Sequence, residues 1–230
     1  MSAAGQYAVL PCLQDAFTLH VDTSACGRIA AYDPVRRDTW FFRDLILQSG
    51  HVYGLVSEYG QGCEAVACML AGQTAFDGVQ VLCGGHALTR GELCSAAWNL
   101  EPLHQPYSKK QVRASIERAL RSRGGNPDFQ FVAEQFALTA ERYDRRFSAL
   151  SGERWRAAAA LGYASGKRIF YAAYHPSIFY RQLMQAGFSA ALTALCKAGA
   201  LVLLPTGSGA LIGSIADTVL YLDPETYGAE

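Results

Sequence analysis

Short apolar runs that predict strands recur along the chain. Residues 18–22 (TLHVD) alternate apolar and polar side chains, which is typical of a strand with one buried face. Residues 51–56 (HVYGLV) form a short apolar run, and residues 168–174 (RIFYAAY) indicate a buried strand. The runs that we interpret as strands are 18–22, 40–47, 51–56, 168–174, 200–204 and 218–222.

Between these runs lie segments with helical patterns. Residues 108–123 place Val112, Ile116 and Leu120 on one face, and glycines follow at the end of the segment. Residues 63–71 are apolar almost all round, which is typical of a buried helix. Helices are predicted over residues 63–71, 108–123, 129–139, 155–163, 182–197 and 209–216. Because strands alternate with helices, we expect an α/β fold with a mainly parallel sheet covered on both faces.

Composition narrows the class of protein. The chain has 230 residues, half of them apolar, which is enough for one sizeable α/β domain or two small ones. Its 20 basic and 20 acidic side chains cancel, so the charge does not indicate a nucleic-acid partner. A zero net charge favours a protein that works in a complex. Seven cysteines without a CxxC pair indicate reduced thiols in a cytosolic protein.

We expect no segment that spans a membrane. The first residues lack the basic and apolar regions of a signal peptide. The most apolar stretch, 188–222, is interrupted by Lys197, Pro205 and several glycines. The protein is therefore expected to lie at a membrane only by binding a protein that spans one.

A glycine-bearing loop follows the predicted strand 51–56. A phosphate-binding loop reads G-x-x-x-x-G-K-[ST] between a strand and a helix. Here Ser57 stands at the first position, and Gly60 and Gly62 supply the glycines of the turn. Cys63 replaces the lysine, and Glu64 replaces the hydroxyl residue that would bind magnesium. The loop keeps the turn of a phosphate site but not its charge.

These replacements act against a triphosphate. A unit charge at contact distance contributes roughly 4 kcal/mol at an effective dielectric near 20. Losing the lysine and gaining Glu64 should therefore abolish tight binding of Mg-ATP, and we expect no hydrolysis at this loop. Two alternatives remain open at this point: Glu64 takes up a proton, or it binds magnesium directly.

A second motif identifies a family that the chain resembles. In "ALSGERWRAAAALGYA", Leu150, Ser151 and Gly152 are followed by Glu153 and an alanine-rich segment. This resembles the LSGGQ or LSGGE signature of the ATP-binding subunits of ABC transporters, with Glu153 in place of the second glycine. The resemblance extends from about residue 18 to residue 223. It implies an ABC-ATPase-like P-loop fold over residues 1–230, with an N-terminal antiparallel β part and a helical subdomain at about 100–160.

Other family positions are matched in part. Tyr32 stands where the family places an aromatic side chain that stacks on adenine. The run from Tyr32 through 40–47 resembles the N-terminal hairpin of polysaccharide- and teichoic-acid-type exporters. The glutamine that contacts magnesium and the membrane subunit corresponds to Asn99 or to Gln105.

The resemblance also shows which catalytic positions have changed. Tyr174 and His175 stand where the second ATPase motif carries its magnesium-binding aspartate and catalytic glutamate. Gly207 stands at the position of the switch histidine. We therefore interpret the chain as a pseudo-ATPase that lacks a nucleotide cofactor at its own site.

The family architecture assigns a role to the signature. Two subunits meet head to tail, and each ATP site combines the phosphate loop of one with the signature of the other. We expect Ser151 as a helix N-cap, with its hydroxyl and the Gly152 amide directed at a partner's γ-phosphate. The chain would then share Mg-ATP at the site of an intact ABC ATPase subunit. The same resemblance implies transmembrane permease subunits and a peripheral place on the cytoplasmic face of the membrane.

Two other classes of function remain. The fold could serve as a scaffold or regulatory interaction module that has left transport. The chain could also be an enzyme of another class that uses Cys63, through a pKa lowered at a helix N-terminus, or His175 as a base. The plainer interpretation of both residues is packing within the core.

Overall fold

The computed structural model describes residues 11–13, 15–26, 31–33, 38–40, 44–103, 105–124 and 128–222. A five-stranded sheet forms its centre, in the order β11-β5-β10-β9-β8, and every neighbouring pair is parallel. Its strands are β5 (Val52–Val56), β8 (Ala97–Asn99), β9 (Ile169–Tyr171), β10 (Leu201–Thr206) and β11 (Thr218–Tyr221). The expected parallel sheet is therefore confirmed.

The two faces of the parallel sheet bury different cores. Along β10, Leu201 and Leu203 face one core, and Val202 and Leu204 face the other. This alternation follows from the period of two in a strand. Because both faces are covered, β10 is buried at every position, which explains why its sequence is apolar from Leu201 to Pro205.

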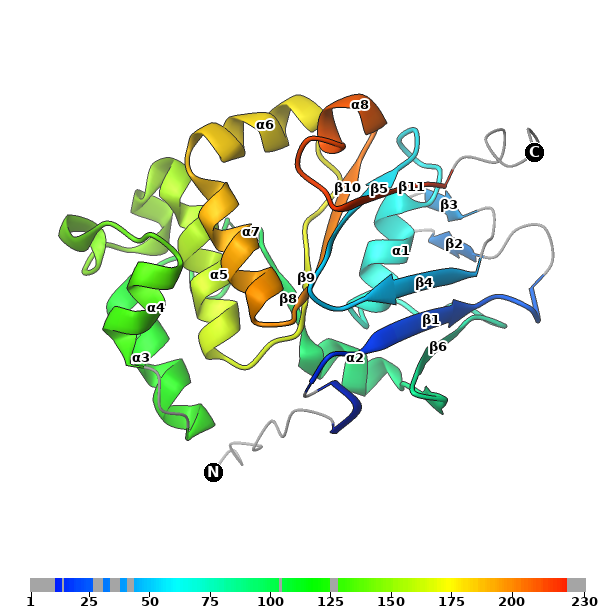
Figure 1. Cartoon of the computed structure of the whole chain (residues 1–230), viewed down its shortest axis with the longest axis horizontal. Helices are drawn as coiled ribbons and strands as arrows, with labels where there is room; N and C mark the ends of the chain where they lie inside the picture. Colours follow the sequence, from blue (N-terminus) through cyan, green and yellow to red (C-terminus); the bar gives the residue numbers. More distant parts are fainter. Residues whose placement is uncertain are drawn as a thin grey trace.

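An antiparallel layer covers one face through helix α1 (Cys63–Leu70). This layer is the sheet β4-β1-β6-β7, and it lies on the right of Figure 1. Its strands are β1 (Thr18–Asp22), β4 (Leu45–Gln48), β6 (Gln80–Cys83) and β7 (His86–Ala87). A separate antiparallel pair, β2 (Ala31–Asp33) and β3 (Asp38–Trp40), contacts α1. The antiparallel β part expected from the resemblance is thus present.

Helices cover the other face and continue away from the sheet. They are α3 (Val112–Arg123), α4 (Phe129–Gln135), α5 (Arg154–Ala164), α6 (Ser177–Gln185), α7 (Phe188–Lys197) and α8 (Gly209–Ile212). Figure 1 shows α3 and α4 at the end of the molecule opposite the antiparallel strands. The apolar stripe of α3 joins the same core as α5 and α7. No helix among the described residues combines the length and apolar character that a membrane span requires.

Some predicted elements differ from the structure. The predicted helix 182–197 is two helices, because Gly187 adopts φ 83° at the break between α6 and α7. The strand predicted over 168–174 ends early, at Tyr171. The sequence patterns did not identify β6, β7, β8 or the helix α2 (Arg90–Ala96). These elements are only two to seven residues long, so their periodicity is short.

Candidate functional site

The predicted phosphate loop, second-motif, switch and coupling positions lie at one edge of the parallel sheet. The loop 57–62 follows β5, Gly207 follows β10, Tyr174 and His175 follow β9, and Asn99 ends β8. Because these strands are parallel neighbours, their carboxyl ends meet at the same edge. Residues far apart in the sequence are thereby brought into one region.

The loop 57–62 has the predicted strand–loop–helix context. Gly60 and Gly62 adopt φ 85° and 106°, conformations that residues with a Cβ rarely take. Ser57 is buried; its amide donates to the Thr206 carbonyl, and its hydroxyl accepts from the Cys63 amide at 3.2 Å. Ser57 therefore holds the start of α1 against the end of β10.

A carboxylate from β3 binds the amides of this loop. One oxygen of Asp38 accepts from the Gly62 amide at 2.6 Å, and the other accepts from the Ala65 amide at 2.6 Å. Asp38 is 2% exposed. Hydrogen bonds to a charged acceptor are about twice as strong as neutral ones, and a helix N-terminus favours negative charge. The chain therefore supplies its own anion to the loop.

The backbone of β3 also lies directly on the loop. The Thr39 amide donates to the Gly60 carbonyl at 2.9 Å. A Cβ at position 62 would lie 2.8 Å from the Cα of Trp40 and 3.2 Å from the Thr39 carbonyl oxygen. Gly62 is thus required by the close approach of β3 as well as by its own positive φ.

Sequence reasoning missed Asp38, because it lies 24 residues before Gly62. The available signal was indirect. Helix α1 begins after a glycine, so the residue before it has no side chain to cap the free amides. Such a helix needs an acceptor from elsewhere, but the sequence does not say which of several nearby carboxylates supplies it.

Cys63 lies in this buried region and is a neutral thiol. Burial raises its pKa to about 12; the carboxylates of Asp38 and Glu64 act in the same direction, and the hydrogen bond with Ser57 opposes them. The nucleophile hypothesis required a lowered pKa. The structure corrects it: the plainer interpretation of Cys63 as a packed residue agrees with its burial.

Tyr174 fills the space beside Gly207. A Cβ at position 207 would overlap the Tyr174 hydroxyl, so a larger residue there would displace the end of the Tyr174 side chain. The Tyr174 ring also contacts Tyr59 of the loop edge-on, with centroids 5.3 Å apart, and Tyr59 is itself 70% exposed. The absence of a side chain at Gly207 thus leaves the space that the Tyr174 hydroxyl occupies.

His175 is both packed and paired. Its Nε2 lies 2.7 Å from Oε1 of Glu101, and its ring stacks on Phe179 with centroids 4.2 Å apart. Asn99 turns its side chain back on its own loop, where Oδ1 accepts from the Glu101 amide at 2.8 Å. Glu101, which sequence reasoning also missed, thus links the loop after β8 to the end of β9.

The signature segment is a 3₁₀ turn, Ser151–Glu153, that leads into α5. Ser151 is exposed and adopts φ 51°, which is unusual for a residue with a Cβ. The expected N-cap role of Ser151 is wrong, because α5 begins at Arg154 and the residue before it is Glu153. The hydroxyl of Ser151 therefore lies at the surface without a capping function.

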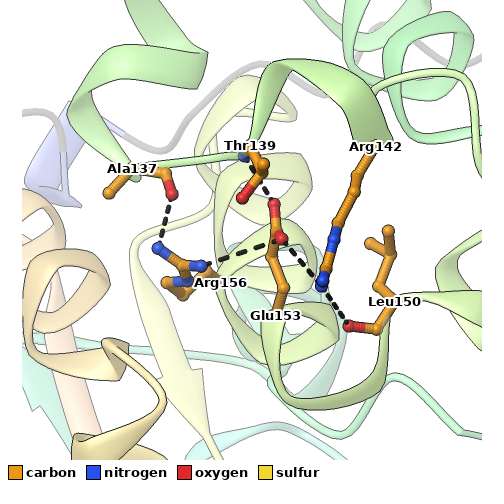
Figure 2. Close-up of polar contacts among 6 residues, drawn as sticks. All are labelled: Ala137, Thr139, Arg142, Leu150, Glu153 and Arg156. Carbon is orange, nitrogen blue, oxygen red and sulfur yellow. Dashed lines mark hydrogen bonds and ion pairs between the residues drawn. The ribbon is translucent and has the colours of Figure 1, made fainter.

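Glu153 points into the protein, as Figure 2 shows. It is 5% exposed, and its oxygens accept from the Thr139 amide at 2.7 Å and from Arg142 at 3.3 Å. Arg156 lies 3.8 Å away and also donates to the Ala137 carbonyl. The negative charge of Glu153 is therefore neutralised within the chain and does not extend outward from the signature.

The predicted adenine-stacking position has only a partial counterpart in the structure. Tyr32 lies in β2, but its side chain falls outside the described residues. The described histidines, cysteines and carboxylates include no group of three or more in a metal-binding arrangement.

The fold resembles solved structures of one kind. CbiO1 from Clostridium perfringens, part of the ABC transporter complex cbiONQ, aligns with a TM-score of 0.69 at 13% identity, over 91% of this chain and 86% of that chain. MJ1267, an ATP-binding cassette of an ABC transporter in its ADP conformation, aligns with a TM-score of 0.66 at 13% identity, over 90% and 87%. The chain has the fold of an ABC-transporter ATP-binding cassette.

A larger protein contains the same fold. A bacterial Atm1-family ABC exporter with ATP bound aligns with a TM-score of 0.60 at 16% identity, over 94% of this chain and 39% of that chain. No protein-family model and no curated protein matches the chain. The fold class expected from the two motifs is thus confirmed by structure.

The first prediction concerns Glu153. Replacing Glu153 with Ala leaves two arginines and the Thr139 amide without their shared acceptor. The free energy of unfolding should fall by about 2–4 kcal/mol, measured by chemical denaturation. Glu141→Ala, an exposed change in the same cassette segment, should shift it by less than about 0.5 kcal/mol. Equal losses in the two variants would show that the Glu153 contacts do not stabilise the signature.

The second prediction concerns Cys63. Its thiol should react with iodoacetamide far more slowly than the exposed Cys94 at pH 8, as peptide mass spectrometry would show. The pKa of the thiol is 9.0 in the unfolded chain and about 12 in the folded chain. The free energy of unfolding should therefore be unaffected by this thiol below pH 9 and should fall as the pH rises above 9, because only the unfolded chain then loses the proton. Cys63→Ala should reduce that loss. Rapid labelling of Cys63 below neutral pH would restore the nucleophile hypothesis.

Proposed function

We propose that the chain is a catalytically degenerate cassette subunit of an ABC transporter. It pairs with an intact ATPase subunit and with membrane permease subunits, and it couples their ATP use to transport. The observation that carries the proposal is a cassette fold whose phosphate loop is bound by the chain's own Asp38. A subunit of this kind acts through its partners and not through a reaction of its own.

The residues at the loop do not fit Mg-ATP. The two amides bonded to Asp38 are donors that phosphate oxygens would need, and Cys63 supplies no cation. Tyr174 and His175 do not supply the carboxylate oxygens that magnesium prefers. The His175 ring is oriented by its contacts with Glu101 and Phe179. We therefore propose that this loop binds no Mg-ATP and hydrolyses none.

The signature retains the features that a partner's nucleotide would use. Ser151 presents an exposed hydroxyl on a backbone with φ 51°, a conformation that costs of order 1 kcal/mol or more. The charge of Glu153, which replaces the second glycine of the signature, is directed inward. In the proposed heterodimer, Ser151 and the Gly152 amide bind the γ-phosphate of Mg-ATP held by the partner.

The proposal extends to coupling and to location. The loop that begins at Asn99 is braced by the Glu101–His175 pair, which joins it to the end of β9. We assign this loop to the contact with the membrane subunit, on the cytoplasmic face of the membrane. The exporter class proposed from the sequence, polysaccharide or teichoic acid, rests on the run from Tyr32, which includes the β2–β3 pair.

A scaffold or regulatory module with the same fold is the second candidate. The hydrogen bonds between Asp38 and the loop amides favour the scaffold equally, because a scaffold also needs no nucleotide. The composition of the native complex separates the two. Purification of the tagged chain in mild detergent should yield an intact ABC ATPase and a multi-span protein in stoichiometric amounts. A soluble homodimer without them would favour the scaffold.

The third prediction concerns activity of the purified complex. Ser151→Ala should lower its ATPase activity at least about tenfold, because it removes a ligand of the transferred phosphate. Ser148→Ala is a matched control, since Ser148 is also exposed and lies three residues earlier. Cys63→Ala should leave the activity unchanged. Equal loss in Ser151→Ala and Cys63→Ala would contradict the asymmetric arrangement.

A further inference from the structure

We propose that Asp38 is a tethered ligand that occupies a phosphate position of the loop, and that the strand β3 and a free phosphate compete for the same two amides. The inference deepens the proposed function and rests on the proposed loss of nucleotide binding at this loop. It concerns the chain alone, so it is tested without any partner.

The geometry of the contact supports this assignment. The amides of Gly62 and Ala65 belong to the end of the loop and the first turn of α1, where a phosphate loop directs its donors. Asp38 places one oxygen on each, both at 2.6 Å. A carboxylate presents two oxygens on one centre, as two oxygens of a phosphate do. Asp38 therefore imitates part of a phosphate group.

The amide of Cys63, between these two, is also engaged within the chain. It donates to the Ser57 hydroxyl at 3.2 Å. Three of the four amides from Gly62 to Ala65 thus have acceptors that the chain provides. An incoming phosphate would reach the Gly62 and Ala65 amides only by displacing Asp38, since both amides are bonded to it. Ser57, which accepts from the Cys63 amide, is buried.

The rest of β3 holds Asp38 in place. Trp40 is fully buried in the core between the two sheets, and the Thr39 amide is bonded to Gly60. A tethered group acts at an effective concentration of millimolar or higher, and a rigid tether raises it further. Free phosphate at millimolar concentration therefore does not displace Asp38, which keeps the loop closed in the native protein.

The experiment removes the carboxylate and supplies the anion from solution. The full-length Asp38→Ala chain is titrated with inorganic phosphate, and its unfolding temperature is compared with that in sodium chloride of equal ionic strength. Asp38→Ala should be less stable than the native chain. At ten times the fitted dissociation constant, phosphate should raise its unfolding temperature by about 3–6 °C. The native chain should show no phosphate-specific rise.

Asp44→Ala provides a matched control. Asp44 also accepts from a backbone amide and a hydroxyl, those of Thr23, both at 2.8 Å, but it lies away from the loop. This variant should lose stability without recovering it in phosphate. An equal response of Asp44→Ala, or of the native chain, would overturn the proposal, as would an Asp38→Ala chain that is folded but indifferent to phosphate.

A second measurement covers the case in which Asp38→Ala does not fold. In the native chain, the amide protons of Gly62 and Ala65 should exchange slowly with solvent in phosphate-free buffer, and their NMR shifts should not change on adding phosphate. Fast exchange, or shifts that follow the phosphate titration, would overturn the proposal. Neither result depends on membrane partners, so failure here is distinguishable from failure of the transporter assignment.

Discussion

The contact between the Asp38 carboxylate and the start of α1 organises this protein. A buried carboxylate is costly unless it is paired or hydrogen-bonded, and here two backbone amides at the positive end of a helix stabilise it. Through this contact the β2–β3 pair is attached to the loop that follows β5. The same contact satisfies amides that a phosphate-binding protein leaves available for its ligand.

Other positions at this edge of the sheet that differ from the ATPase motifs also make contacts within the chain. Gly207 leaves room that Tyr174 occupies, and His175 takes up Glu101 and Phe179 as neighbours. Both side chains are thus held by contacts within the chain at this edge of the sheet.

Glu153 shows that a charge at a motif position need not act on a ligand. Its carboxylate is shared by Arg142, Arg156 and the Thr139 amide inside the domain. Breaking such a cluster on one side is more costly than its formation is stabilising, because an uncompensated charge remains. The signature turn is thus braced from within, while Ser151 stays at the surface.

Sequence alone determined the fold class and the order of the main elements. Periodicity located β5, α1, α3 and β10, because burial on one face or on all sides leaves a local pattern of apolar residues. The loop and signature motifs indicated the cassette fold because the residues of each motif are adjacent in the sequence. Tertiary structure alone decided what Asp38, Glu101 and Glu153 do. Apart from Arg156, which lies three residues after Glu153, their partners lie 11 to 74 residues away. A carboxylate carries no local sign of which distant amide or cation it will meet.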